Sequence, residues 1–398
     1  MSTTSSKPMR ATRSAWGLVL AVMLARIAFG YQMQTVASLG PELVSAFQID
    51  FAALGTLMGA YMLAGVAVAI PSGFIARRFG AHRVLAWGVL LMAAGRVLAA
   101  VADTPSGIGV GRGVSGAGAV AMTVMQGKLI SDRFAGAGFS RVMGLTVGAF
   151  PIGIGLAQLT QVRLAAAFGL GAPFMAGAAL ALFAWLLFVL SWNAVPGTSP
   201  PGGSRTVAWP SRRENILVVL ASLVWTAYNA AYFNFLAFMP SYLASRGHPA
   251  LVADLVMTIA TWGNLPAILL GSALAIHFGR LAVFLVGTTV CAISVAGPVL
   301  FDVPLLWGLL FGTVAAIHGG LIVEIGTLSA QPENREVGMG LFYTTYYIGG
   351  SITPALCGLA ADLVGNPGGA LLCAATLSLL AVPFFVLHQR MAGQVARR

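Results

Sequence analysis

Long apolar segments recur through this chain from end to end, and they constrain the fold more than any other feature. Each has about 20 residues, which as a helix crosses a hydrocarbon core of about 30 Å. Only 8% of the 398 residues are charged, whereas a soluble domain carries about 25%. The pattern excludes a soluble globular protein. It predicts an all-α membrane protein with twelve transmembrane helices at residues 15–38, 51–75, 83–101, 107–130, 139–163, 170–192, 215–242, 252–276, 282–300, 305–329, 336–360 and 367–390.

Basic residues are distributed unevenly in this arrangement. Of the 22 lysines and arginines, three lie well inside spans, and of the others, which lie in loops or at span ends, only Arg163 and Arg246 are on the side opposite the termini. Because basic residues accumulate in cytoplasmic loops, both termini are predicted to be cytoplasmic, and we expect a bacterial plasma (inner) membrane. The net charge of +11 therefore mainly reflects the orientation of the chain in the membrane. It does not indicate binding to nucleic acid, and we expect no nucleic-acid partner.

A stretch rich in Pro, Gly and Ser divides the spans into two groups of six. It predicts a cytoplasmic linker at residues 193–214 between an N-terminal half, residues 1–192, and a C-terminal half, residues 215–398. Residues that follow the second span recur after the eighth at an offset of 199, namely Phe79/Phe278, Gly80/Gly279 and Gly88/Gly287. This repeat indicates two related halves with a central site at their interface.

Three segments resemble motifs of the major facilitator superfamily of secondary transporters. GFIARRFGAHR is similar to the family's loop after helix 2, Gly-x-x-x-Asp-Arg-x-Gly-Arg-Arg, through Gly73, Arg78 and Gly80, with Arg77 in place of the aspartate. RGVSGAG resembles the Arg-x-x-x-Gly-x-Gly motif of the fourth span through Arg112. The opening ARIAFGYQMQTVASLGPEL is similar to the branch that contains cyanate-permease-like and organic-anion carriers.

The resemblance covers nearly the whole chain and implies two pseudo-symmetric six-helix halves that alternate access to a midplane site. It implies a gating role for the loop at Gly73, Arg78 and Gly80. In other members this loop also provides a charge relay, and this role is not inferred here because Arg77 replaces the aspartate. It also implies a monomer. The fifth span, GLTVGAFPIG, resembles an antiporter motif, but Pro151 comes two residues late and antiport is not inferred.

Charged residues within the spans carry the functional prediction, because each costs about 2.5 to 3.5 kcal/mol at mid-bilayer. Arg26 and Arg96 lie near the middle of spans 1 and 3, Arg112 nearer the outer end of span 4, and Glu324 near the inner end of span 10. Three cations and one anion cannot all pair, which indicates an aqueous cavity of positive potential. We predict Arg26 and Arg112 as ligands of a substrate carboxylate or oxyanion. The alternative for all three arginines is a structural role.

Several uncharged side chains are further candidates for substrate contact. Two aromatic faces repeat at helical spacing in spans 7 and 11, and by the resemblance both helices line the central pathway. The alternative for each face is packing, and a buried amide usually completes a hydrogen bond between helices. The aromatic candidates are Tyr228, Tyr232, Tyr343, Tyr346, Tyr347 and Trp262, and the amide candidates are Gln34, Asn229, Gln158 and Asn264.

Glu324 and His318 are the candidates for proton coupling, since a carboxylate or imidazole in a cavity can titrate near working pH. Six residues separate them, which is about 240° around a helix, so they do not form one acid/base pair. The alternative for Glu324 is a salt bridge with a basic residue near the inner gate.

The predicted function is secondary active transport of a small anion, such as a monocarboxylate, a dicarboxylate or a cyanate-like ion, by proton coupling or exchange. The alternative is a proton-coupled exporter of lipophilic or cationic compounds, which the many aromatic residues support. The chain shows neither the nucleophile or metal set of an enzyme nor the soluble output domain of a sensor. We therefore expect no enzyme activity and no cofactor.

Overall fold

A computed structural model describes residues 13–134, 137–192, 210–331 and 335–393. Within these ranges the protein is helical and contains no β-strand. Helices satisfy every backbone N–H and C=O group within one segment, which an apolar environment requires. Ten helical segments are individually long and apolar enough to cross a membrane.

Each span of the first half is one main helix. These are α1 (Arg13–Ser38), α3 (Phe51–Phe79), α4 (Ala81–Ala100), α5 (Pro105–Arg133), α6 (Ala137–Phe168) and α7 (Ala172–Trp192), with the short α2 (Gly40–Phe47) after α1.

Three spans of the second half are interrupted. The unbroken helices are α8 (Arg212–Ser245), α11 (Arg280–Leu300) and α14 (Arg335–Val364). The paired helices are α9 (Ala250–Trp262) with α10 (Asn264–Phe278), α12 (Pro304–Thr313) with α13 (Gly319–Leu328), and α15 (Gly368–Leu379) with α16 (Ala381–Gly393).

Each of the twelve predicted spans thus corresponds to one helix or one helix pair, and the all-α twelve-span architecture is confirmed. Most of the predicted linker, residues 193–209, lies outside the described residues. The second half begins with α8 at Arg212, three residues before the predicted boundary.

Proline accounts for two of the three interruptions. Pro266 and Pro383 lack the N–H group that would bond one turn back, just where α10 follows α9 and α16 follows α15. In the third, between α12 and α13, the N–H groups of Val314 and Ala315 both bond to the carbonyl of Leu310. This non-helical backbone is tolerated at membrane depth because protein buries it, as the burial of residues 315–318 shows.

The two halves repeat each other's geometry. Gly80 and Gly279 each end one helix and begin the next, with φ/ψ of 86°/145° and 82°/148°. Positive φ values of this size favour glycine, which explains the recurrence of this residue at the offset of 199. The same offset relates two contacts between helices, Gly113 against the carbonyl of Ala60 and Gly312 against the carbonyl of Ile259.

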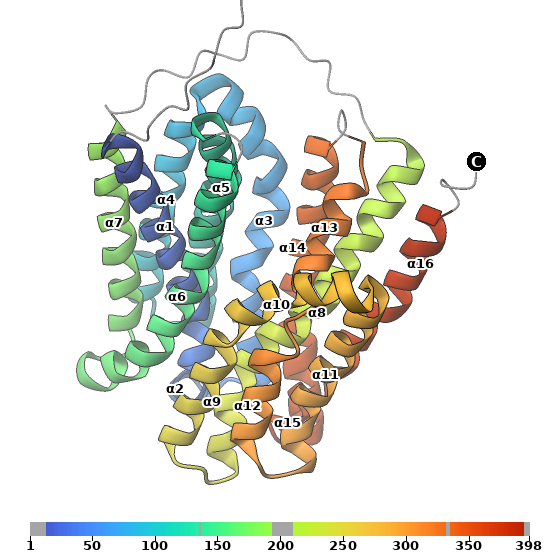
Figure 1. Cartoon of the computed structure of the whole chain (residues 1–398). Helices are drawn as coiled ribbons and strands as arrows, with labels where there is room; N and C mark the ends of the chain where they lie inside the picture. The colour runs from blue at the N-terminus through green and yellow to red at the C-terminus, as the bar shows by residue number, and fades with distance from the viewer. Residues whose placement is uncertain (1–12, 135–136, 193–209, 332–334, 394–398) are drawn as a thin grey trace, which may run out of the picture.

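The halves are packed together mainly at one end of the bundle. We call the end where α7 ends and α8 begins the linker side, and the opposite end the far side (Figure 1). On the far side, Gly55 and Gly59 of α3 face the carbonyls of Pro354 and Ser351 on the antiparallel α14. On the linker side of α3, no heavy atom of the described residues lies within 4 Å of a Cβ built on Gly73. The far side is therefore closed by direct contact between the halves.

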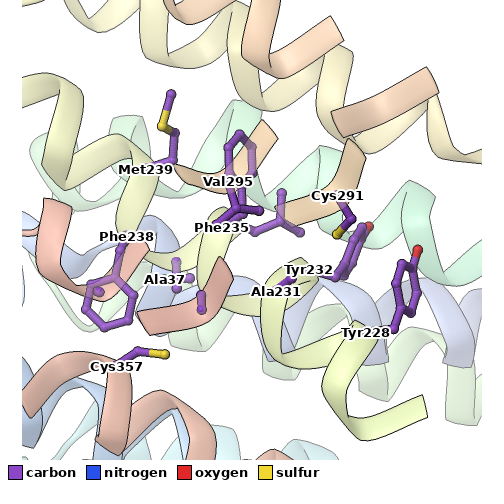
Figure 2. Close-up of a cluster of buried hydrophobic side chains, with 14 of the residues drawn as sticks. Ala37, Tyr228, Ala231, Tyr232, Phe235, Phe238, Met239, Cys291, Val295 and Cys357 are labelled. Carbon is purple, nitrogen blue, oxygen red and sulfur yellow. The ribbon is translucent and has the colours of Figure 1, made fainter. Parts of the chain in front are cut away.

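A large apolar cluster surrounds α8 on this side. It includes Phe235, Phe238 and Met239 of α8, all fully buried, together with Val295 of α11 and Cys357 of α14. Figure 2 shows Tyr228 and Tyr232 extending the same cluster along α8. The cluster fixes α8 against both α11 and α14, and so fixes the wall of the central interface.

Candidate functional site

Arg26 lies on α1 at the interface between the halves, with 9% of its surface exposed. Its Nη1 donates to the Thr123 hydroxyl on α5 at 3.1 Å. The guanidinium lies 5.4 Å from the ring centres of both Phe29 and Phe150, and its Nε is buried with no hydrogen-bond partner in the described part of the chain. No acidic side chain of the described residues pairs with it. Arg26 is thus a desolvated cation held by rings and one hydroxyl.

Aromatic side chains of the second half face Arg26. Tyr343, Tyr346 and Tyr347 of α14 all lie in the neighbourhood of its guanidinium. Tyr346 and Tyr347 are buried with ring centres 5.3 Å apart, and Trp225 of α8 lies 6.3 Å from Tyr346. The structure therefore brings the predicted aromatic face of span 11 together with the predicted arginine of span 1.

Arg112 connects three helices of the first half. From α5, its Nε donates to the Leu57 carbonyl at 2.6 Å, and its Nη2 reaches the carbonyls of Met58 at 3.3 Å and Met33 at 3.5 Å. Its Nη1 is buried and has no partner within the described ranges, and the ring centre of Tyr61 lies 5.2 Å from the guanidinium. Three of its five N–H groups thus donate to the backbone, and the two on Nη1 have no partner among the described residues.

A cavity of about 40 Å³ lies between the halves beside Arg112. This volume holds about two or three water molecules. Five helices contribute to its wall, and Arg112 is the one charged residue among the described lining residues. They are Met33, Gln34 and Ala37 of α1, Met58 and Met62 of α3, Arg112 of α5, Asn229, Phe233, Asn234 and Ala237 of α8, and Gly350, Thr353 and Pro354 of α14.

Arg26 lies along the same face of α1 as two residues of the cavity wall. Arg26, Met33 and Ala37 follow each other at i, i+7 and i+11, so they share a face of α1, and Tyr343 and Gly350 share a face of α14 in the same way. Seven residues of helix span about 10 Å. The candidate site therefore extends from Arg112 toward Arg26 in the linker-side direction.

Sequence reasoning missed several lining residues. Thr123 holds Arg26, and Asn234 and Thr353 line the cavity. Asn234 follows the predicted Asn229 by five residues in an apolar helix, a polar signal that could have identified it. The methionine-rich wall gave no signal, because methionine is equally common in ordinary cores.

The predicted amides serve partly as structural contacts. Gln34 is buried, and its Nε2 has no partner among the described residues. Asn229 donates to the Trp225 carbonyl at 2.8 Å and lines the cavity. Asn264 accepts from the Tyr228 hydroxyl at 3.4 Å and lies outside the lining set.

Other aromatic and amide candidates lie in packed interfaces. Tyr232 stacks on Phe311, with ring centres 5.8 Å apart, and Tyr228 meets the ring of His318 at 4.8 Å. Trp262 packs on Gly155 across the seam between α6 and α9. In the same seam Gln158 accepts from Thr261 at 3.2 Å.

Arg96 has the contacts of a structural residue. It is fully buried within the first half, where its Nη2 donates to the Gln32 carbonyl of α1. The ring centres of Phe174 and Tyr61 lie 5.3 and 5.8 Å from its guanidinium. None of these contacts reaches the second half.

Glu324 lies near the linker side and pairs with Arg280, with Oε1 2.7 Å from Nη2. The two side chains are 41% and 59% exposed. This is the ion pair that the alternative interpretation of Glu324 describes. Glu324 therefore lies apart from the described lining of the central cavity.

His318 is buried where α12 gives way to α13. Its ring packs edge-on against Tyr228 and against Phe284 at 5.6 Å. Gly287 provides the space for this ring, because a Cβ there would lie 2.4 Å from Nδ1. His318 and Glu324 are thus in different environments.

The predicted gating loop forms the linker-side turn between α3 and α4. Gly80 has the positive φ already described, and the exposed Arg78 lies over the ring of Phe79 at 5.5 Å. Gly73 lies in open surroundings. The side chain of Arg77 lies outside the described residues.

Comparisons with known proteins agree with this architecture. A family model described as Major Facilitator Superfamily matches residues 20–354. The inner membrane transport protein YajR of Escherichia coli (strain K12) is 25% identical over 388 residues, which cover 92% of this chain and 82% of the relative.

Two solved structures share the fold. The xylose transporter XylE from E. coli, in an inward open conformation, matches with a TM-score of 0.75 and 15% identity over 93% of this chain and 95% of that one. The nucleoside transporter NupG matches with a TM-score of 0.71 and 15% identity over 94% and 99% of the two chains. With the twelve-span fold and the site between two repeated halves, these findings establish that the chain belongs to the Major Facilitator Superfamily and is a membrane-embedded secondary transporter of a small molecule.

Proposed function

We propose that this protein transports a small organic anion of the monocarboxylate type. The observation that carries the proposal is the charge of the central site, where Arg26 and Arg112 both lie at or near the interface and neither pairs with an acid among the described residues. Each buried cation is costly in a membrane. A bound carboxylate would offset that cost through charge-assisted hydrogen bonds.

The size and lining of the cavity favour a small ligand with an apolar part. Its volume of about 40 Å³ is well below the 300–1,000 Å³ of typical drug-sized sites. Met33, Met58, Met62 and Phe233 provide apolar wall beside Arg112. One carboxylate with a short aliphatic body matches this combination better than a dianion does.

The proposal includes the coupling and the orientation. Basic residues on the linker side would place both termini in the cytoplasm of a bacterium, so that the far side faces outward and is closed in this structure. Glu324, on the linker side, would carry the proton, or transport would proceed by exchange. The protein would work as a monomer and without enzymatic turnover.

A binding experiment tests the proposal. Purified protein is screened by thermal shift with acetate, propionate, benzoate, succinate, cyanate and chloride, and compared with the Arg26→Gln, Arg26→Lys and Arg112→Gln variants. We expect stabilisation by a monocarboxylate that disappears in Arg26→Gln and weakens in Arg26→Lys, because an ammonium group lacks the planar fork of a guanidinium.

The matched control is Arg163→Gln, which removes an exposed far-side arginine that lies 3.7 Å from Asp254. It should respond like the wild type. If no anion stabilises the wild type, or if both Arg26 variants respond fully, the anion proposal fails.

The second candidate is an exporter of lipophilic or cationic compounds, and the cluster of Tyr343, Tyr346, Tyr347 and Trp225 favours it. Against it, the acid that a cation site needs is absent from the described cavity lining, and Glu324 is paired with Arg280. Stabilisation by lipophilic cations and not by carboxylates would favour this candidate.

A further inference from the structure

The far-side end of α3 is capped by a carboxylate of the other half. Asp362, near the end of α14, accepts from the backbone N–H of Phe51 through Oδ1 at 2.9 Å and from that of Ala52 through Oδ2 at 2.8 Å. Asp50, directly before α3, accepts from the N–H of Ala53 at 2.7 Å. The first three N–H groups of α3 therefore all have carboxylate partners, and the second half supplies two of them.

A glycine places this carboxylate within reach. Gly358 lies four residues before Asp362, on the same face of α14. A Cβ on Gly358 would lie 2.0 Å from the carbonyl oxygen of Phe51. The missing side chain thus lets the α14 backbone approach the start of α3 closely, and the next turn delivers Asp362 to the helix N-terminus.

We propose that Asp362 is a latch that holds the far side closed, whatever solute the protein carries. The N-terminal N–H groups of a helix lack intrahelical partners and favour negative charge. If the halves separate on the far side, Asp362 leaves these groups, whereas Asp50 stays with its own helix. Asp362 therefore stabilises the closed state and not the open one. Only a contact that differs between two states in this way shifts the equilibrium between them.

The other described polar contacts between the halves on this side are weaker. Arg163 and Asp254 are 3.7 Å apart and 71% and 44% exposed, a geometry that contributes little. Gln158 and Thr261 form one neutral hydrogen bond. On the linker side, Arg77 occupies the place of the aspartate in the resembling loop motif. The far-side carboxylate is therefore the strongest described polar contact between the halves.

Spin-label distances across the far side test the latch in the full-length protein. Labels are placed on cysteines at the exposed positions Asp103, in the first half, and Ala244, in the second, with Cys291, Cys357 and Cys373 replaced by alanine. In Asp362→Ala we expect the population with a long far-side distance to rise at least about tenfold, because two charge-assisted hydrogen bonds are lost from the closed state alone. Asp362→Asn, which keeps one acceptor oxygen and the side-chain volume, should give a smaller rise.

Asp50→Ala is the matched control, because it removes a carboxylate cap from the same helix end without removing a contact between the halves. It should leave the distance distribution unchanged. An unchanged distribution in both Asp362 variants would overturn the proposal, as would an equal shift in Asp50→Ala. Asp362→Asn decides the question if Asp362→Ala cannot be purified. This measurement uses no transported solute, so its outcome is independent of the anion proposal.

Discussion

Replacing Gly59 by alanine should open the far side without unfolding either half. Gly59 lies in the middle of the α3–α14 seam, where a Cβ would stand 2.0 Å from the carbonyl oxygen of Ser351. The contacting atom belongs to the backbone, so no side chain can rotate away. The two helices must separate.

The size of the effect follows from this geometry. Real Cβ atoms do not approach other heavy atoms closer than 3.0 Å, so α3 and α14 must move apart by at least about 1 Å at this level. Overpacking of this kind costs about 1–3 kcal/mol. Because the cost falls on the closed state alone, it should raise the far-side-open population by about 5- to 150-fold.

Two alanine substitutions serve as controls for the same spin-label measurement. Gly73→Ala lies in the same helix, but no atom of the described residues lies within 4 Å of its Cβ, so the distances should not change. Gly116→Ala meets the Tyr61 carbonyl at 1.9 Å within the first half, so it should lower the unfolding temperature and leave the open population unchanged. If Gly59→Ala gives the same distance distribution as Gly73→Ala, close packing at Gly59 does not hold the far side closed.

Three further predictions concern single side chains. Arg96→Met should lower the free energy of unfolding by about 1–3 kcal/mol, because the bond from the guanidinium to the Gln32 carbonyl is lost. Anion binding by the folded fraction should persist, and a selective loss of binding would contradict the structural role. Glu324→Gln should abolish pH-driven accumulation in proteoliposomes while counterflow exchange continues, whereas loss of both would identify a structural acid. Ser211→Ala removes the side-chain cap of α8, where Ser211 and Glu214 form a capping box, and should cost about 0.5–2 kcal/mol in thermal unfolding; Ser245→Ala, at the other end of α8, should cost less.

Regular features of the sequence predicted the architecture well. Twelve apolar runs specified twelve spans, because a helix is the one way for a single segment to satisfy its own backbone in lipid. The repeated Gly80 and Gly279 marked equivalent turns, since both adopt a positive φ. The helix interruptions were not predicted, although Pro266 and Pro383 signal two of them. The break at residues 314–318 has no proline and depends on how α12 and α13 pack.

The candidate site was predicted less completely. Arg26, Arg96 and Arg112 look alike in the sequence, as lone cations in apolar helices. Their partners differ: Arg26 faces tyrosines of the other half, whereas Arg96 and Arg112 donate to backbone carbonyls of their own half. Sequence spacing specifies the face of a helix, but it does not specify which helix lies opposite.

The sequence by itself determined that this chain spans a membrane with two repeated halves and carries more buried cations than acids. These properties depend on the hydrophobicity of short segments, on the positions of proline and glycine, and on charge. All of these can be read from single residues without knowing how the helices pack. The tertiary structure decided which arginine faces the other half and that Asp362 caps α3, across 310 residues of chain. Such contacts depend on the crossing and register of helices distant in sequence, which only the packing of the whole bundle fixes.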